Sequence, residues 1–177
     1  GLFAISSVLT NIKDGYGILL SGDTISKTIP SNDLGSMLLF GDGVNATLVQ
    51  NKKNTHSYFN IGSAGFGSKM LMIEGSGFNK SLKKPKFFMD GKEVFSFALK
   101  NVPNLINELK KKYKIKDNKI DYYVFHQANK MMLEKIFEIL KIPKTKRIFS
   151  IERFGNTSSA SIPITLCNSR YKRFKKC

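Results

Sequence analysis

The sequence predicts an α/β layered fold, because stretches with strand-like and helix-like hydrophobic spacing follow one another along its 177 residues. Apolar residues make up 41% of the chain, which is enough to build a hydrophobic core. Short apolar runs at residues 18–20, 37–40, 46–49 and 122–125 predict strands. The strands at residues 18–20, 37–40 and 122–125 are expected to be buried. Longer stretches with apolar residues three or four positions apart predict the helices between them.

The first half of the chain contains one predicted helix and a long connection. Apolar residues recur at helical spacing within residues 2–13, and two glycines follow. The sequence at residues 41–43 (GDG) separates two of the predicted strands. Residues 50–86 are rich in Gly, Ser, Asn and Lys, which is typical of a surface connection, with a candidate strand at residues 70–73.

The second half begins with a long predicted helix. Asp90 and Glu93 are spaced as in a capping box, and apolar residues continue at helical spacing to Leu109. Pro103 should kink or divide this helix. The later elements are expected in this order: a charged turn at 110–119, a strand at 122–125, a helix at 133–140, a strand at 148–151, a turn at 154–157 and a helix at 158–166.

The charge and the cysteines narrow the classes of partner and of site. A formal charge of +16 favours acidic partners, such as nucleic acid, anionic lipid, a phosphorylated cofactor or an acidic carrier protein, without choosing among them. The two cysteines, Cys167 and Cys177, do not make a disulfide framework, and no metal-ligand spacing is present. A reducing cytoplasm is the expected compartment. No apolar run approaches the roughly 18 residues of a membrane span.

Two residues could carry chemistry at the ends of predicted elements. His126 directly follows a predicted strand, and ligands of open α/β sheets bind at the carboxyl ends of strands. Asn156 lies in a turn at the start of a helix. Both side chains donate hydrogen bonds, so the pair, aimed at one point, would stabilise a developing oxyanion. Spacing alone also fits a structural core histidine and an ordinary turn residue; the oxyanion hypothesis requires that the two side chains face one pocket.

Four segments resemble the β-ketoacyl-acyl-carrier-protein synthase III family. Residues 126–129 (HQAN) resemble its histidine motif, and residues 155–163 (GNTSSASIP) resemble its asparagine motif. Residues 40–43 (FGDG) resemble a conserved turn, and residues 89–95 (MDGKEVF) resemble the segment that opens the C-terminal half. The four segments occur in the family's order across nearly the whole chain, so the chain resembles the C-terminal portion of a family member.

The resemblance implies a thiolase-like layered fold, in which two similar α/β halves stack. Only part of that fold would be present here. Residues 1–60 would be the trailing part of the N-terminal half, residues 61–86 a connecting excursion, and residues 87–177 a truncated C-terminal half. We therefore expect exposed apolar surface and unpaired strand edges where the remaining strands would pack, involving residues 18–20 or 37–39.

The resemblance also implies a decarboxylating Claisen condensation. In it, a cysteine takes an acyl group from a thioester, malonyl-carrier protein loses carbon dioxide, and the carbanion attacks the acyl carbon. His126 and Asn156 would be the catalytic pair that holds the malonyl thioester oxygen. The implied substrates are acyl-coenzyme A or another acyl thioester, with no cofactor and no metal. The implied partners are acyl carrier protein and, in the full-length enzyme, a second copy; neither nucleic acid nor a membrane span is expected.

Three departures from the family pattern affect this interpretation. The nucleophilic cysteine would lie about two residues before Gly1, outside this chain, and Cys167 is expected to be a buried packing residue of the last helix. Leu34 replaces an arginine that helps family members bind coenzyme A, which puts coenzyme A in doubt as the acyl donor. Residues 171–177 are highly basic, and either a truncated or shifted reading frame or a solvated helix end fits them.

Carrier-protein docking and the overall role leave alternatives open. Lys130, Lys92 and Lys100 are the candidate docking residues, although each also fits a merely solvated surface. One hypothesis is a fragment of an acyl-transferring condensing enzyme, which we expect to be inactive alone because it lacks the cysteine. A second is a non-catalytic product, either the remnant of a broken gene or the partner subunit of a split condensing enzyme. A basic nucleic-acid-binding domain is a third hypothesis, but the sequence lacks an arginine-rich stripe and an aromatic RNA-binding motif.

Overall fold

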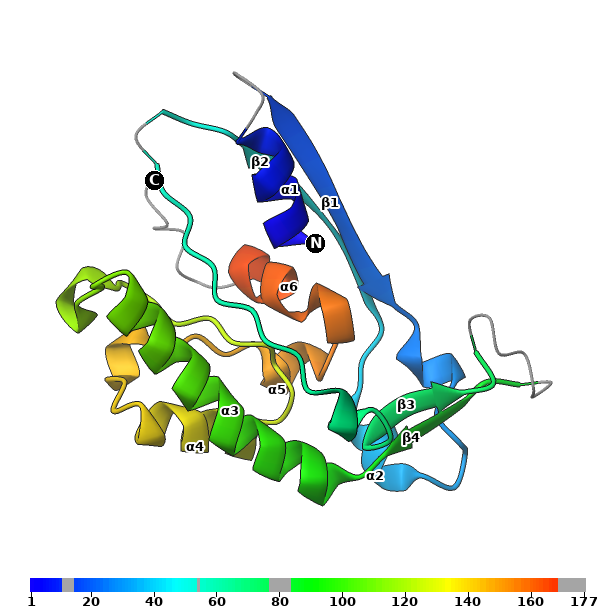
Figure 1. Cartoon of the computed structure of the whole chain (residues 1–177). Helices are drawn as coiled ribbons and strands as arrows, with labels where there is room; N and C mark the ends of the chain where they lie inside the picture. The colour runs from blue at the N-terminus through cyan, green and yellow to red at the C-terminus, as the bar shows by residue number, and fades with distance from the viewer. Residues whose placement is uncertain (11–14, 54, 77–83, 169–177) are drawn as a thin grey trace.

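The computed structural model describes residues 1–10, 15–53, 55–76 and 84–168, which form helices and two antiparallel strand pairs (Figure 1). The strands are β1 (Tyr16–Asp23) paired with β2 (Gly43–Gln50), and β3 (Leu71–Glu74) paired with β4 (Lys86–Met89). The α-helices are α1 (Leu2–Leu9), α2 (Leu34–Leu39), α3 (Gly91–Lys112), α4 (Lys130–Ile139), α5 (Ile151–Phe154) and α6 (Ser161–Asn168). The 3-10 helices are η1 (Ile25–Lys27), η2 (Gly65–Gly67), η3 (Asp117–Lys119), η4 (Lys144–Lys146) and η5 (Ser158–Ala160).

The α6 helix lies at the centre of the arrangement of helices and strand pairs. This helix lies between the long β1–β2 ribbon and the α3–α4 pair, while β3 and β4 lie at the N-terminal end of α3 (Figure 1). A core cluster under α4 consists of Tyr123, Leu133, Phe137 and Ile142, and the Phe137 side chain is completely buried. The Arg147 guanidinium lies over the Phe137 ring, with its Cζ 5.3 Å from the ring centroid. This contact attaches the segment that leads to α5 to the core cluster.

The expected strand at residues 37–40 is wrong, because residues 37–39 form the end of α2 and Phe40 is its extended C-cap residue. The Asp33 carboxylate accepts the Ser36 backbone N–H at 3.0 Å and so caps the N-terminus of the helix. A run of four apolar residues does not distinguish a buried strand from a short helix, and here the cap decides the conformation. Leu38 remains 89% exposed on the outer face of this helix.

Two further strand predictions are wrong. Neither residues 122–125 nor residues 148–150 form a strand, and the only ladder contact there among the described residues is an isolated parallel bridge between Tyr123 and Arg147. Ile151 already begins α5. An apolar segment becomes a strand only where neighbouring strands pair with it, and among the described residues no other strand lies against these two segments.

The long helix is confirmed, including its N-terminal cap. The Asp90 carboxylate accepts the Glu93 backbone N–H at 3.1 Å. Pro103 does not divide α3, which is assigned without a break from Gly91 to Lys112. Pro103 is buried, and this packing offsets the loss of its backbone donor. The candidate strand near residue 70 is confirmed as β3.

The strand at residues 18–20 is confirmed as part of β1, but its burial is not. Ile18 and Leu20 are 65% and 73% exposed, and they face Leu48 and Ala46 of β2 across the ladder. Exposed and less exposed positions alternate along both strands, so one face of the ribbon is an open apolar surface. The expectation of exposed apolar side chains on this ribbon and on α2 is therefore confirmed. The three-part division of the chain stays a prediction.

Candidate functional site

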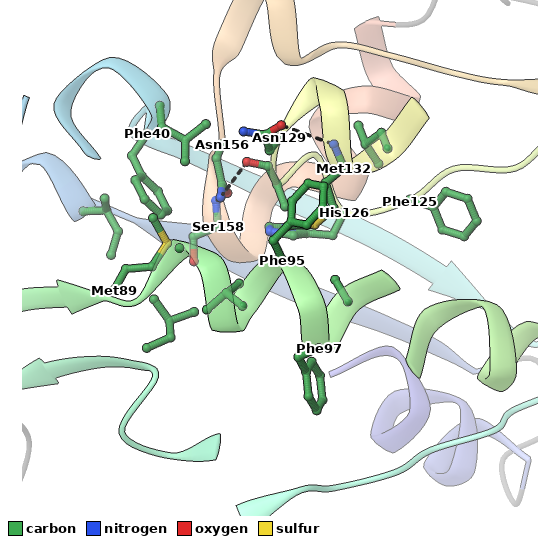
Figure 2. A pocket seen from close by; sticks show the side chains of 18 of the residues that line it. Phe40, Met89, Phe95, Phe97, Phe125, His126, Asn129, Met132, Asn156 and Ser158 are labelled. Carbon is green, nitrogen blue, oxygen red and sulfur yellow. Dashed lines mark hydrogen bonds between the residues drawn. The ribbon is translucent and has the colours of Figure 1, made fainter. Parts of the chain in front are cut away.

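His126 and Asn156 line one cavity of about 580 Å³ (Figure 2). Its walls are mainly apolar and come from the end of α2, the β3–β4 hairpin, the first half of α3 and the start of α4. Phe40, which bridges to Asn156, also lines the cavity, as do Met89 and Phe95 (Figure 2). The structure thus brings together the two residues that the sequence singled out, in an apolar pocket of the size that holds small ligands.

His126 ends the extended segment that precedes α4. The residue as a whole is exposed, yet protein atoms surround much of the ring and desolvate it. This desolvation lowers the pKa of His126 from its ordinary value of 6.5, and a hydrogen bond with the Ser158 backbone only partly opposes the shift. The imidazole is therefore neutral at physiological pH, with one N–H donor and one acceptor nitrogen.

Asn156 is buried and held from several sides. Its backbone N–H donates to the Leu39 carbonyl at 2.9 Å, and its carbonyl accepts the Gly41 N–H at 3.0 Å. Its side-chain Oδ1 accepts the Ser158 N–H at 3.0 Å, and Nδ2 donates to the Ala128 carbonyl at 3.4 Å. The amide nitrogen carries two protons, so one donor remains for a ligand.

Two glycines allow the backbone to hold Asn156 in this place. Gly155 has a φ of 65°, in the left-handed region that favours glycine. A Cβ on Gly41 would lie 2.2 Å from the Phe154 carbonyl oxygen. Gly41 belongs to the FGDG segment, so the backbone of this segment packs directly against the loop that carries Asn156.

Two carboxylates, whose roles were not predicted from the sequence, fix the neighbouring loops. Asp42 accepts hydrogen bonds from the Ser26 hydroxyl and backbone N–H, which lower the Asp42 pKa. Asp23 accepts from the backbone N–H and hydroxyl of Ser159, at 3.2 and 2.8 Å. Burial raises the pKa of Asp23, but hydrogen bonds from Ser158 and Ser159 outweigh it, and the net pKa is lowered. Asp42 lies in a recognised segment, whereas nothing in the sequence around Asp23 pointed to a contact more than 130 residues away.

The three candidate docking lysines are exposed and lie near the cavity. Lys130 begins α4 and pairs with Glu152 of α5, which raises the Lys130 pKa. Lys92 follows Gly91, and Lys100 lies on α3 two residues after Ala98; both Gly91 and Ala98 line the cavity. The positions agree with a docking role, which stays a prediction.

Cys167 is exposed, contrary to the expectation that it is buried. It lies on α6, where the Asn45 side chain of β2 approaches its Sγ at 3.9 Å. Cys167 is not among the described residues that line the cavity. Cys177 and residues 171–177 lie outside the described residues. Within the described part of the chain, no group of three or more His, Cys, Asp or Glu could hold a metal ion, and no helix is long and apolar enough to cross a membrane.

The comparisons with known proteins agree with the resemblance. Residues 110–176 match the model of the "3-Oxoacyl-[acyl-carrier-protein (ACP)] synthase III C terminal" family. The chain is 35% identical over 160 residues to the β-ketoacyl-[acyl-carrier-protein] synthase III of Clostridium perfringens, covering 86% of this chain and 49% of that protein. It is 31% identical to the enzyme of the same name from Lactobacillus helveticus, covering 94% and 54% of the two chains.

The fold comparison gives the same result. The crystal structure of a 3-oxoacyl-(acyl-carrier protein) synthase from Burkholderia xenovorans superimposes with a TM-score of 0.84 at 30% identity, covering 97% of this chain and 52% of that one. The predicted thiolase-like fold is thereby confirmed. The chain spans about half the length of the relatives that it matches.

Proposed function

The chain belongs to the β-ketoacyl-acyl-carrier-protein synthase III family, and we propose that its His126–Asn156 cavity is the malonyl-thioester site of a decarboxylating condensing enzyme. One observation carries this proposal: the two side chains, 30 positions apart in the sequence, line the same apolar cavity. The proposed reaction serves fatty acid or specialised acyl-chain synthesis.

The chemistry follows from two hydrogen-bond donors aimed at one oxygen. When the carbon–carbon bond to the malonyl carboxylate breaks, its electron pair moves into the thioester and places negative charge on the carbonyl oxygen. Neutral His126 and the free amide proton of Asn156 stabilise that charge, and the apolar walls strengthen both interactions by excluding water. Carbon dioxide leaves, and the resulting carbanion either attacks the carbonyl carbon of an acyl group held on a cysteine, which breaks the C–S bond and releases the cysteine thiolate, or takes a proton and becomes an acetyl thioester.

The proposed acyl donor is a thioester, either acyl-coenzyme A or another acyl carrier. Leu34 is 66% exposed in the first turn of α2, where an arginine would otherwise offer a positive charge to a phosphate. We therefore favour a donor other than coenzyme A. The proposed partners are acyl carrier protein, bound by Lys130, Lys92 and Lys100, and a second copy in the whole enzyme. The cytoplasmic location stays a prediction.

The nucleophile decides between a catalytic and a non-catalytic role for this chain alone. The condensation needs an acyl group bound covalently beside the malonyl site, and Cys167 lies on α6 against Asn45 instead. The chain alone should therefore not complete the condensation. The alternative, the partner subunit of a split condensing enzyme, draws support from the open apolar face of the β1–β2 ribbon, which a second polypeptide could cover.

An assay of both half-reactions tests this proposal. The chain is incubated with an acyl thioester and malonyl-carrier protein, and mass spectrometry then reads the protein and the products. We expect acetyl-carrier protein from slow decarboxylation, no ketoacyl product, and the same result after Cys167→Ala and Cys177→Ala. An acyl adduct on Cys167 together with a ketoacyl product would show that the nucleophile has been misplaced, and the absence of decarboxylation would refute the proposed site.

The pH dependence of the decarboxylation should report on His126. Since its pKa is lowered below 6.5 in the folded chain, the neutral donor persists to a lower pH than in an ordinary histidine. The rate should fall only as the pH drops below 6.5 through that lowered pKa. In the same pH range the free energy of unfolding should decrease, because the unfolded state binds the proton more readily than the folded state. A pH–rate profile of kcat/KM, which reports the chain without substrate, checks this; an acidic limb centred above 6.5 would contradict it.

A further inference from the structure

Gln127 directly follows His126 and is an almost completely buried amide, with 1% of its surface exposed. Its Oε1 accepts the backbone N–H groups of Ser150 and Ile151, at 2.8 and 3.2 Å. Its own backbone N–H donates to the Ser161 hydroxyl at 2.6 Å. The residue next to His126 is therefore bonded to the starts of both α5 and α6.

These two helices flank Asn156 in the chain. α5 ends at Phe154, Asn156 follows two residues later, and Ser161 begins α6. Asn156 itself donates to the carbonyl of Ala128, the neighbour of Gln127 on the other side from His126. Both ends of the Asn156 loop are thus fixed relative to the His126 segment through hydrogen bonds of one side chain and its backbone.

The surrounding polar groups form one buried network. The Gln127 amide nitrogen donates to the Phe125 carbonyl at 2.9 Å, so both the oxygen and the nitrogen of the side-chain amide are hydrogen-bonded. The Ser150 and Thr165 hydroxyls lie 2.6 Å apart, and Thr165 donates to the Ser161 carbonyl at 2.7 Å. A buried network with its members bonded permits one arrangement of its elements, because any shift leaves polar groups unpaired away from water.

We propose that Gln127 is a positioning residue that sets the distance and orientation between the His126 ring and the Asn156 amide. The inference rests on the proposed function of that pair and goes beyond it by naming the residue that aligns the two donors. Gln127 acts from behind the cavity wall and does not touch the substrate.

The test compares Gln127→Met, which removes the amide at similar length, with Gln50→Met, the same change at an exposed position of β2. In the malonyl-thioester assay we expect Gln127→Met to lower kcat roughly 10- to 100-fold with KM within about twofold, because misplaced donors weaken the transition state. Gln50→Met should change neither. An unchanged kcat in folded Gln127→Met, or a loss confined to KM, would overturn the proposal.

A milder variant and a second readout keep the test decisive. If Gln127→Met does not fold, Ser161→Ala removes one bond to Gln127 and should lower kcat about 3- to 10-fold. If the unmodified chain has no activity, the proposed function fails, and NMR then decides the positioning role. Cross-relaxation between His126 ring protons and Asn156 amide protons should be present in the unmodified chain and in Gln50→Met, and weakened in Gln127→Met or Ser161→Ala. Its absence from the unmodified chain, or its persistence in both variants, would rule the role out.

Discussion

His126→Ala and Asn156→Ala should each lower the decarboxylation of a malonyl thioester about 100- to 1000-fold. Each substitution removes one of the two donors proposed to stabilise the charge developing on the thioester oxygen, and the loss of one such donor has about this effect on kcat. The double variant should fall by less than the product of the two effects, because one donor alone holds the oxygen poorly. Steady-state release of carbon dioxide measures all three rates.

The chain supplies matched controls for both substitutions. His56 is the other histidine of the chain, is exposed, and stacks with Tyr58 outside the described lining of the cavity. Asn118 is exposed in η3, within the turn after α3. His56→Ala and Asn118→Ala should leave the rate within about twofold. If either control lost as much activity as its counterpart, the effect of the site variants could not be assigned to the missing donors.

Gly41→Ala should both destabilise the fold and abolish most of the activity. The new Cβ would lie 2.2 Å from the Phe154 carbonyl oxygen, and a backbone atom cannot yield as a flexible side chain does. We expect a loss of about 2–3 kcal/mol in the free energy of unfolding, as for other overpacked sites. The displaced loop carries Asn156, so decarboxylation should fall on the order of 100-fold. Denaturant unfolding and the same rate assay measure the two effects.

Gly62→Ala is the control for this change. A Cβ at Gly62 would meet no atom within 4 Å, so the variant should unfold at the same denaturant concentration as the unmodified chain and keep its activity. A fully stable and active Gly41→Ala would mean that the FGDG segment does not support the Asn156 loop as closely as the bridge between Phe40 and Asn156 implies.

The sequence predicted the helices better than the strands, for a physical reason. The α3 helix was predicted from a local cap at Asp90 and a regular apolar spacing, and both features are present in the structure. Residues 37–40 carry no periodicity long enough to distinguish a strand from a helix, and with the Asp33 cap residues 37–39 form the end of α2. Residues 122–125 have strand-like composition, but a strand also depends on distant neighbours, which composition does not reveal.

The sequence singled out the two residues that share the cavity, His126 and Asn156, but not the contacts that hold them there. His126 and Asn156 lie in segments whose order and composition resemble family motifs, so the pair was recognisable before its cavity was seen. By contrast, the Asp23 carboxylate accepts a hydrogen bond from Ser159, which is 136 residues away in the sequence, and only the folded chain brings the two together. Gln127 belongs to a recognised motif, but its contacts with Ser150 and Ile151 follow from tertiary packing, so its role could not be read from the motif.

A crystal structure of the chain with a non-cleavable malonyl-thioester analogue tests the central claim most directly. The account predicts that the thioester oxygen of the analogue lies within about 2.7–3.1 Å of a His126 ring nitrogen and of Asn156 Nδ2 at once, with its apolar part against the walls that contain Phe40 and Phe95. An analogue bound elsewhere, or one whose oxygen contacts neither nitrogen, would contradict the assignment of this cavity as the malonyl-thioester site.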